Sequence, residues 1–347
     1  MSISLLLEMA SSANADRTAL VAGETRLTTE ELSALADGGA GVIAASGAQH
    51  VAYVGAGAAM LPLLLFASAR AAIPVTPLNY RLSAAGLKEL IDRLPQPLVI
   101  VDPEYADVVN GMSSVDFIAA ARQAEPVAEF ADPDAVAVVL FTSGTTSKPK
   151  AVELTHNNLT SYVTGSVEFD SAEPGDAALI CVPPYHIAGV SAALSNLYAG
   201  RKMVYLPQFD PREWVRLVRD EGVSSATVVP TMLDRIVTVL EDEPTPLGSL
   251  RTLAYGGSKV ALPLVRKALE LMPGVGFVNA YGLTETSSTI AVLTPDDHRL
   301  ALGSSDPAAA RRLGSVGQVL PGVEAQIRGE DGTVLGAGET GELFVRG

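Results

Sequence analysis

From about Val136 onward, short runs of β-branched and aliphatic residues alternate with segments of helical periodicity. Runs of this length, bounded by Gly, Pro and Asn, are typical of buried strands. One helix is expected to start after Thr155 and another to end near Gly200. The expected strands are AVAVVLFTS, ALICVPP, RKMVYLP, SATVVP, RTLAYGG and GFVNAYG. This alternation predicts an α/β fold with mostly parallel sheets.

The segment between RKMVYLP and SATVVP carries the start and stop signals of a helix. Asp210 is a favourable N-cap, and Pro211 suits the first helical position. Gly222 stands where a left-handed C-terminal cap is expected.

Residues 51–69 form an uncharged, largely apolar run about as long as a membrane span. Gly55 and Gly57 divide the run into a short strand, VAYVG, and a helix that continues through Arg70. We interpret both as buried elements of a layered core and not as a transmembrane segment. The N-terminus also lacks the basic start and cleavage site of a signal peptide.

After about Arg312 the pattern changes to short alternating runs separated by Gly-rich turns. This pattern predicts a small antiparallel sheet or barrel. We therefore divide the chain into two α/β subdomains, residues 1–311, and the start of a subdomain that is a small antiparallel sheet or β-barrel, residues 312–347. The chain stops at Gly347 directly after the strand-like ELFVR. A sheet ended there would expose an unpaired edge, so we expect a piece of a longer protein.

The composition is that of a globular protein, with 48% hydrophobic and 18% charged residues. A formal net charge of −15 argues against nucleic acid or anionic lipid as a partner, so a polyanionic ligand needs a local cationic site. The single cysteine, Cys181, permits neither an intramolecular disulfide nor a thiolate metal cluster. These features favour a reducing, cytoplasmic location.

The densest chemistry lies in FTSGTTSKPK, at the end of the expected strand AVAVVLFTS. Small residues let backbone N–H groups approach an anion, hydroxyls add donors, and lysines neutralise charge, as in a polyphosphate-binding loop. The spacing is not that of Walker A, and no GxGxxG fingerprint follows a strand. A solvated turn rich in Ser and Thr is the simpler alternative.

A second segment, NAYGLTE at residues 279–285, also follows an expected strand. Tyr281 could stack on a base, Thr284 could donate to a phosphate, and Glu285 could hold Mg²⁺, which prefers oxygen ligands shared with substrate phosphates. The alternative is a helix N-terminus capped by Thr284. A third segment, YGGS at residues 255–258, is either a tight turn or a flat backbone floor for adenine.

These three segments, in this order, resemble the adenylate-forming superfamily of acyl-CoA synthetases, luciferases and adenylation domains of peptide synthetases. The family pattern aromatic-Thr-Ser-Gly-Thr-Thr-Gly-x-Pro-Lys-Gly corresponds to FTSGTTSKPKA, Tyr-Gly-x-Thr-Glu to YGLTE, and the Gly-Gly turn to YGGS. The resemblance extends over essentially the whole chain through PLNYRLS, PPYHIAG and GSVGQVLPG. PLNYRLS and PPYHIAG resemble fatty-acyl or aryl acyl-CoA ligases more than peptide-synthetase domains.

The resemblance implies a fold of two stacked αβαβα subdomains with mostly parallel sheets, followed by a small distorted antiparallel β-barrel. It also implies a role for each matching residue. The catalytic residues would be Thr284, Glu285 and Lys150, with Glu285 as the metal ligand. The ATP phosphates would bind Thr142, Ser143, Gly144, Thr145, Thr146 and Lys150. Adenine would contact Gly256, Gly257, Ser258, Asn279, Ala280, Tyr281 and Gly282. The acyl pocket would contain Tyr185, His186, Val229 and Thr231.

The implied reaction uses ATP, Mg²⁺ and coenzyme A, with a small carboxylic acid as substrate. The carboxylate attacks the α-phosphorus in line and pyrophosphate leaves, so positioning and charge neutralisation replace a protein nucleophile. For His186, a buried core histidine with satisfied hydrogen bonds is an equal alternative to a substrate wall.

Two departures and several missing parts qualify this picture. Ser147 and Ala151 stand where the family usually has glycine, and the loop would be strained if either position needs a positive φ. The family also uses a Tyr/Thr-Gly-Asp segment, a hinge and a C-terminal domain with a catalytic lysine, which the 347 residues lack. We therefore expect weak binding of acid or nucleotide and slow adenylate formation.

Other functions remain open at this point. A fatty acyl-AMP ligase that delivers its product to a carrier protein is the nearest competitor. A non-catalytic binding protein with the same fold is the alternative from another class, because a fold does not guarantee a function. The identity of the acid and the oligomeric state do not follow from the sequence.

Overall fold

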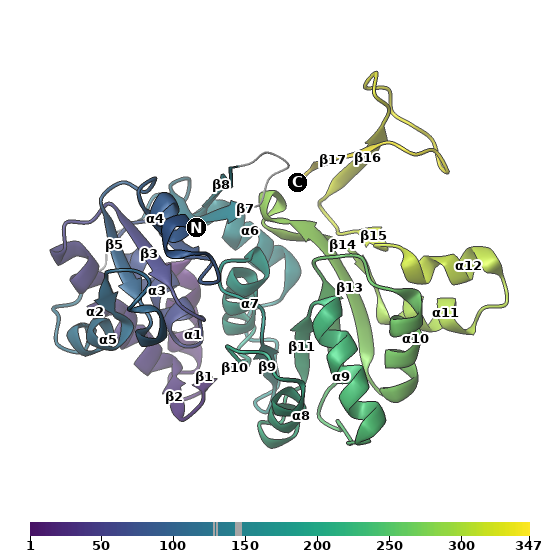
Figure 1. The fold of residues 1–347 in the computed structure, drawn as a ribbon, viewed down its shortest axis with the longest axis horizontal. Coiled ribbons are helices and arrows are strands. Elements are labelled where there is room, and N and C mark those ends of the chain that lie inside the picture. Colours follow the sequence, from purple (N-terminus) through teal and green to yellow (C-terminus); the bar gives the residue numbers. More distant parts are fainter. Residues whose placement is uncertain (128, 130, 143–147) are drawn as a thin grey trace.

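The computed structural model describes residues 1–127, 129, 131–142 and 148–347 of the chain. Two sheets, of nine and six strands, organise this part of the molecule. In Figure 1 the six-stranded sheet lies at the upper left, and the strands of the nine-stranded sheet extend from β2 at the lower left to β14 and β15 at the right. Most neighbouring strands are parallel, as the alternation of strands and helices predicts.

The six-stranded sheet contains the expected strand VAYVG and the strand that precedes the predicted phosphate loop. Its order is β6 (Met112–Ser113), β5 (Pro97–Val101), β3 (His50–Val54), β4 (Val75–Leu78), β7 (Val136–Thr142) and β8 (Lys150–Thr155). Within it, the pair β7 and β8 is antiparallel. An antiparallel hairpin therefore ends this sheet on the side of the predicted phosphate loop.

The nine-stranded sheet contains the other expected strands. Its order is β15 (Gln318–Val319), β14 (Ser288–Leu293), β13 (Gly276–Leu283), β12 (Thr252–Gly256), β11 (Ser225–Val228), β9 (Ala177–Ile180), β10 (Lys202–Tyr205), β1 (Thr18–Ala22) and β2 (Thr25–Thr28). Antiparallel strands stand at both of its ends, where β14 and β15 follow β13 and β2 follows β1.

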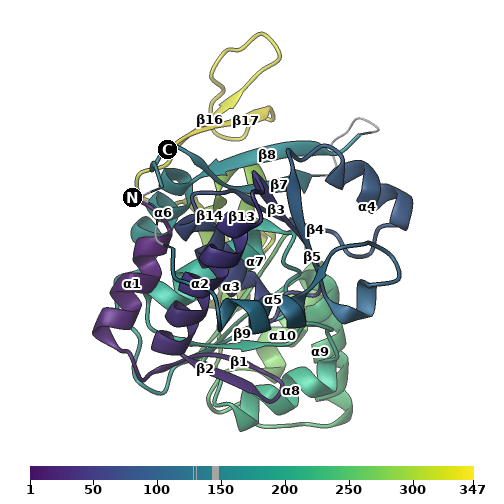
Figure 2. The ribbon, with the colours of Figure 1, turned by 90° about the vertical axis from the view of Figure 1, so that its left-hand side faces the viewer.

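Helices cover both sheets and fill the space between them. The central layer packs into one core and contains α1 (Ser4–Ala13), α2 (Thr29–Ala45), α3 (Met60–Arg70), α5 (Ser114–Ala121), α6 (His156–Ser166) and α7 (Ile187–Tyr198). On the outer face of the nine-stranded sheet lie α8 (Pro211–Asp220), α9 (Pro230–Asp242) and α10 (Leu262–Leu271). α4 (Ala84–Ile91) covers the outer face of the six-stranded sheet. The side view in Figure 2 follows the same layers, which agree with the predicted αβαβα stacking.

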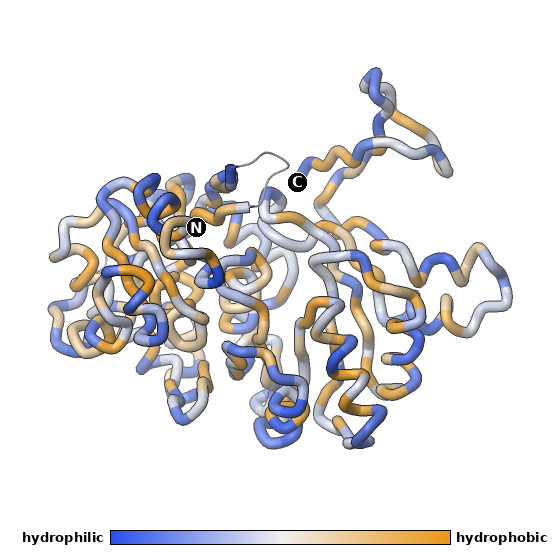
Figure 3. Tube along the Cα trace, viewed as in Figure 1, coloured by the Kyte–Doolittle hydropathy of each residue, from blue (hydrophilic) through white to orange (hydrophobic). Residues whose placement is uncertain are grey.

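Strand residues alternate between two hydrophobic cores, which explains why the strands read as continuous apolar runs. In β3, Val51 and Tyr53 face the central helices, whereas Ala52 and Val54 face α4. Figure 3 shows hydrophobic segments along the strands and hydrophilic segments in many outer loops.

The apolar run that begins at Val51 folds as predicted into a strand and a buried helix. Every residue of α3 is buried, including Arg70 at its end. The Arg70 guanidinium donates to the Ser33 carbonyl at 2.6 Å and pairs with the Asp37 carboxylate at 3.0 Å. No helix in the described ranges combines the length and the apolar character that a bilayer crossing requires.

The predicted helix signals are confirmed at α8. The Asp210 carboxylate accepts hydrogen bonds from the backbone N–H groups of Arg212 and Glu213, both at 2.9 Å. Pro211 begins the helix, and Gly222 follows its end with φ +62°.

The region after residue 311 divides between two sheets. The described part of the chain also contains the short helical elements η1 (Pro103–Tyr105), η2 (Thr284–Thr286), α11 (Pro295–Gly303), α12 (Pro307–Arg311) and η3 (Arg312–Gly314). β15 joins the nine-stranded sheet, while β16 (Glu324–Arg328) and β17 (Glu342–Arg346) form a separate antiparallel pair that projects from the molecule in Figure 1. Of the predicted antiparallel sheet or barrel, the described residues form this two-stranded sheet.

Candidate active site

Four neighbouring parallel strands of the nine-stranded sheet end at the same edge. Their terminal register pairs are Ile180 with Thr227, Val228 with Tyr255, and Gly256 with Ala280. In open α/β sheets, ligands bind outside the carboxyl ends of the strands. The turns that follow hold the predicted acyl, adenine and metal residues, namely 185–186, 229–231, 256–258 and 281–285. The topology therefore brings these segments to one edge.

The Gly-Gly turn after β12 is required by the close approach of β13. A Cβ atom at Gly256 would lie 2.2 Å from the Ala280 carbonyl oxygen, and Gly257 has φ +80°. A Cβ at Gly257 would lie 3.7 Å from the nearest Val229 methyl, so the predicted adenine and acyl segments are neighbours here. Gly257 and Ser258 are exposed, which leaves bare backbone for a flat ligand.

The predicted adenine segment on β13 is half-buried and partly engaged in structural contacts. Asn279, Ala280, Tyr281 and Gly282 are all half-buried. The Asn279 side-chain amide donates to the Ser315 carbonyl at 3.0 Å, and this bond ties β13 to the region after residue 311.

The turn that carries Glu285 is a single 3₁₀ turn, η2, between β13 and β14. The Thr286 hydroxyl accepts from the Leu283 N–H at 3.0 Å and donates to the Ser288 carbonyl at 2.9 Å. Thr286, and not Thr284, therefore closes the turn, so the alternative in which Thr284 caps a helix is wrong. Thr284 is half-buried and Glu285 is exposed, which leaves both side chains available to a ligand.

The end of this turn is strained and anchored to α7. Ser287 and Ser288 have φ values of +57° and +119°, which residues other than glycine seldom adopt. A Cβ at Gly282 would lie 1.7 Å from the Ser288 carbonyl oxygen. The buried hydroxyls of Ser288 and Ser191 lie 3.2 Å apart and connect the turn to α7. Strain of this kind is common at functional sites.

The predicted phosphate loop joins β7 to β8. Thr142 pairs with Lys150 at its base, and Lys148 and Lys150 are exposed. The predicted phosphate ligands Ser143, Gly144, Thr145 and Thr146, together with Ser147, lie outside the described residues. Ala151 pairs with Phe141 inside β8 and is absent from the described residues with positive φ, so the strain considered there does not arise.

β8 lies against η2. β8 belongs to the six-stranded sheet, whereas η2 connects β13 and β14 of the nine-stranded sheet. Figure 1 draws the β13–β14 turn beside β7 and β8. The strand that begins with Lys150 is thus adjacent to the turn that contains Thr284 and Glu285. A hairpin with exposed lysines from the six-stranded sheet and an exposed carboxylate from the nine-stranded sheet thus lie on neighbouring segments.

The predicted acyl residues Tyr185 and His186 belong to an aromatic cluster with Tyr80 and Tyr105. Ring centroids are 4.5 Å apart for Tyr185 and His186, 5.6 Å for Tyr185 and Tyr80, and 5.2 Å for Tyr80 and Tyr105. Tyr80 and Tyr105 were not predicted as site residues. Tyr80 lies two residues after the end of β4, within PLNYRLS, and this position after a strand is the signal that would have identified it.

His186 is exposed, so the alternative of a buried core histidine is wrong. Protein atoms around the ring displace part of its water and, together with the Arg81 charge, lower the pKa of the imidazole. A neutral ring at pH 7 can form part of a substrate wall. Of the other acyl residues, Val229 is half-buried and Thr231 is exposed at the start of α9.

The exposed Glu285 carboxylate suits a magnesium ion that is bound mainly by the phosphates of ATP. The described residues contain no group of three or more His, Cys, Asp or Glu side chains arranged to hold a metal. Glu285 can offer one carboxylate, and Mg²⁺ commonly takes its other ligands from phosphates and water.

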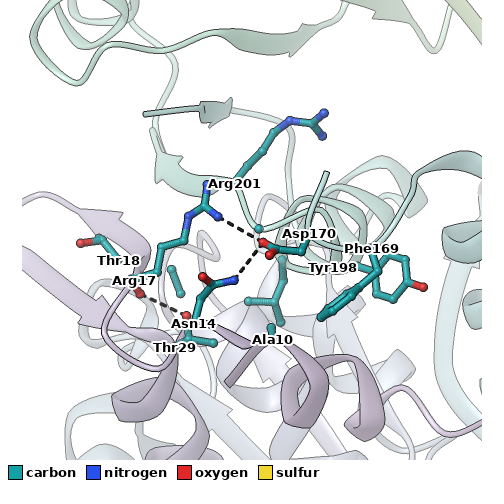
Figure 4. Close-up of a pocket in the computed structure, with 12 residues that line it drawn as sticks. Ala10, Asn14, Arg17, Thr18, Thr29, Phe169, Asp170, Tyr198 and Arg201 are labelled. Carbon is teal, nitrogen blue, oxygen red and sulfur yellow. Dashed lines mark hydrogen bonds and ion pairs between the residues drawn. The ribbon is translucent and has the colours of Figure 1, made fainter. Parts of the chain in front are cut away.

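A small cavity lies away from the candidate site, among residues that bind one another (Figure 4). It has a volume of about 10 Å³, room for roughly one water molecule. Arg17 and Asn14 both contact the Asp170 carboxylate beside it, at 3.2 and 2.9 Å. The cavity borders the amino ends of β1 and β10, at the opposite edge of the sheet from the candidate site.

Comparisons with known proteins show what the chain is similar to. A fatty acid–[acyl-carrier-protein] ligase, ScoC, from Streptomyces coeruleorubidus is 30% identical over 311 residues, which cover 85% of this chain and 58% of that protein. A feruloyl-CoA synthase from an Amycolatopsis species is 31% identical over 342 residues, covering 95% of this chain and 67% of that protein. This chain therefore spans only about three-fifths to two-thirds of the length of these relatives.

The structural comparison covers almost the whole chain. The structure of O-succinylbenzoate coenzyme A synthetase (MenE) from Bacillus subtilis in complex with ATP and magnesium ion matches with a TM-score of 0.82 and 25% identity. The match covers 99% of this chain and 70% of that chain. The model of the family described as AMP-binding enzyme matches residues 7–347. The resemblance seen in the sequence is thereby confirmed, and the chain belongs to the AMP-binding enzyme family.

Proposed function

We propose that the chain is the nucleotide- and acid-binding part of a ligase that activates a carboxylic acid with ATP and transfers the acyl group to coenzyme A. The observation that carries this proposal is the contact between β8 and η2. It places a lysine-bearing hairpin beside an exposed carboxylate, and a triphosphate with its metal needs both charges close together.

The proposed roles follow the positions of the residues. Thr142 and Lys150 bind the β- and γ-phosphates with residues 143–146, Thr284 donates near the α-phosphate, and Glu285 holds Mg²⁺. The Gly-Gly turn and the end of β13 enclose adenine. The acid lies against Tyr185, His186, Val229 and Thr231.

In the proposed first step, a carboxylate oxygen of the acid attacks the α-phosphorus and forms an acyl-adenylate. The bond from the α-phosphorus to the oxygen that bridges to the β-phosphate breaks, and pyrophosphate leaves with that oxygen. Lys150 neutralises charge on the leaving group, and Mg²⁺, when bound, withdraws charge from the phosphate oxygens.

The acyl acceptor must come from outside the described protein core. Burial raises the pKa of the Cys181 thiol to about 12, so this cysteine is neither ionised nor accessible at pH 7. Coenzyme A supplies a free thiol in the proposed second step, which forms a thioester and releases AMP.

The acid class is proposed as fatty, with aryl acids as the second candidate. The names of the relatives include a fatty-acid ligase and a feruloyl-CoA synthase. The aromatic cluster around Tyr185 supports an aryl acid, because rings stack favourably on rings. Transfer to a carrier protein is the alternative for the second step, supported by the carrier-protein ligase among the relatives. We place the enzyme in the cytoplasm.

Calorimetry with Mg·ATP tests the proposal directly, and we expect binding that weakens when Lys150 is replaced by alanine. Absence of heat with the wild-type chain would favour the non-catalytic alternative. Pyrophosphate release should then be compared between the 347 residues and a version extended through the lysine-bearing domain of the family. We expect the extended version to be much faster, and equal rates would contradict the expectation that the 347 residues alone form the acyl-adenylate slowly.

The second assay identifies the substrates of the extended version. Straight-chain, branched and aromatic acids are offered with ATP, and then coenzyme A or a carrier protein is added. Consumption of free coenzyme A supports the proposed acceptor, whereas transfer only to carrier protein supports the alternative.

A further inference from the structure

Arg93 contacts residues on both sides of the predicted phosphate loop. Its guanidinium Nη1 donates to the Pro149 carbonyl at 2.9 Å, and its Cζ lies 4.7 Å from the centroid of the Phe141 ring. Phe141 belongs to β7, and Pro149 directly precedes β8. One side chain therefore joins the two arms of the hairpin.

The backbone of Arg93 is firmly supported. Leu90 and Leu94, on either side in the sequence, are 3% and 8% exposed and belong to the core between α4 and the six-stranded sheet. The Arg93 N–H donates to the Leu90 carbonyl at 3.2 Å, and Phe141 packs against the same core. The guanidinium thus extends from a segment whose flanking residues Leu90 and Leu94 are anchored in this core.

Arg93 also adds charge where the net-charge argument requires it. None of the ion pairs among the described residues includes Arg93, Lys148 or Lys150. In a chain with a formal net charge of −15, three cations near one hairpin form a local positive site.

We propose that Arg93 is a positioning residue for the triphosphate of ATP. It fixes Phe141 and Pro149, and through them the adjacent residues Thr142 and Lys150. This inference rests on the proposed function. Arginine suits the task because its planar guanidinium can donate to a carbonyl while it covers an aromatic ring, which a lysine ammonium does less well.

The test compares three variants by calorimetry with Mg·ATP and with AMP. Arg93→Met removes the charge and both contacts, whereas Arg93→Lys keeps the charge. Lys88→Ala is the matched control, because Lys88 is an exposed cation on α4 that pairs with Asp92. AMP lacks the β- and γ-phosphates, so it reports on the rest of the site.

We expect Arg93→Met to weaken Mg·ATP binding about tenfold and to leave AMP binding unchanged. Arg93→Lys should recover part of the loss, and Lys88→Ala should match the wild type. The melting temperature of Arg93→Met should stay within about 2 °C of the wild type, because exposed contacts contribute little to stability. If the melting temperature of Arg93→Met falls further than this, the ratio of Mg·ATP affinity to AMP affinity is measured for Arg93→Lys instead, and the same change in the ratio tests the proposal.

Unchanged ATP affinity, or equal losses for ATP and AMP, would overturn the role of Arg93 and leave the proposed function intact. A wild-type chain that binds no Mg·ATP would overturn both. The wild-type titration therefore separates the two failures.

Discussion

The two hairpins that meet at the candidate site are held in place in different ways. The β13–β14 hairpin is held mainly by contacts within itself, because the Thr286 hydroxyl closes η2 and Gly282 allows the Ser288 carbonyl to approach. The β7–β8 hairpin is fixed from outside, by Arg93 on Pro149 and Phe141. The proposed metal ligand, Glu285, thus sits on a tightly determined turn, whereas Thr142 and Lys150 sit on a hairpin that is contacted by the turn after α4.

Gly282→Ala should have the largest effect on stability and on Mg·ATP binding, because it disrupts the β13–β14 hairpin. The added Cβ would meet the Ser288 carbonyl oxygen at 1.7 Å, so backbone must move. We expect a loss of about 3 kcal/mol or more in the free energy of unfolding, measured in urea, together with loss of Mg·ATP binding. Gly165→Ala in α6 is the control, because its Cβ would meet no atom within 4 Å. A stable Gly282→Ala variant would show that the turn is less constrained than its geometry indicates.

Acid should lower the free energy of unfolding through two buried histidines near the six-stranded sheet, His50 in β3 and His156 directly after β8. The pKa of both His50 and His156 is lowered to about 4, mainly because the rings are buried. His50 contacts the Thr76 hydroxyl at 2.7 Å, and His156, at the start of α6 directly after β8, accepts from the Ile3 N–H at 3.3 Å.

The folded state keeps both rings neutral, whereas the unfolded chain binds protons below about pH 6.5. Their contribution is therefore present above about pH 6.5 and is lost as the pH falls towards 4, by at most about 3 kcal/mol for each histidine. Urea unfolding at several pH values measures the slope, and His156→Gln should make it shallower. An unchanged slope in this variant would contradict the assignment to His156.

Glu285→Gln tests the other hairpin without disturbing its backbone, because the side chain is exposed. We expect Mg·ATP binding to weaken by a factor of about 30, since the metal loses a charged ligand. Binding of AMP without metal should not change. Glu89→Gln, an exposed carboxylate on α4, is the control. If the loss is the same with and without Mg²⁺, Glu285 is not the metal ligand.

Ser191→Ala should have the smallest effect, because it removes only the bond between α7 and the strained Ser288. We expect a cost of about 1 kcal/mol in unfolding free energy and a two- to threefold weaker affinity for Mg·ATP. Ser195→Ala is a closely matched control on the same helix, because the buried Ser195 hydroxyl has no hydrogen-bond partner among the described residues. Equal effects of the two variants would show that the contact with Ser288 is not important for the site.

The strands, the helix signals and the candidate segments could be predicted because each depends on residues close together in the chain. Asp210, Pro211 and Gly222 mark the ends of α8 by capping geometry alone. The buried strand and helix from Val51 to Arg70 follow from hydrophobicity and two glycines. The role of Thr286 was missed because Thr284 and Thr286 are both plausible caps, and the choice depends on how β14 returns.

Contacts between distant segments could not be predicted from spacing. Arg93 lies 56 residues from Pro149, and nothing in PLNYRLS indicates that Tyr80 would meet Tyr185. For His186, a core histidine and a substrate wall are equal alternatives until the packing around the ring is known. Likewise, β15 reads as part of the region after residue 311, but it pairs with β14.

The sequence by itself determined the α/β class, the main elements and the identity of the residues that carry the proposed chemistry, because these follow from local periodicity, turn preferences and side-chain type. Tertiary structure alone decided that β8 lies against η2, that Ser288 is held by Ser191, and that Arg93 joins both arms of the β7–β8 hairpin. The reason is that such contacts arise from the packing of two separate sheets around shared helices, and no short segment encodes that arrangement.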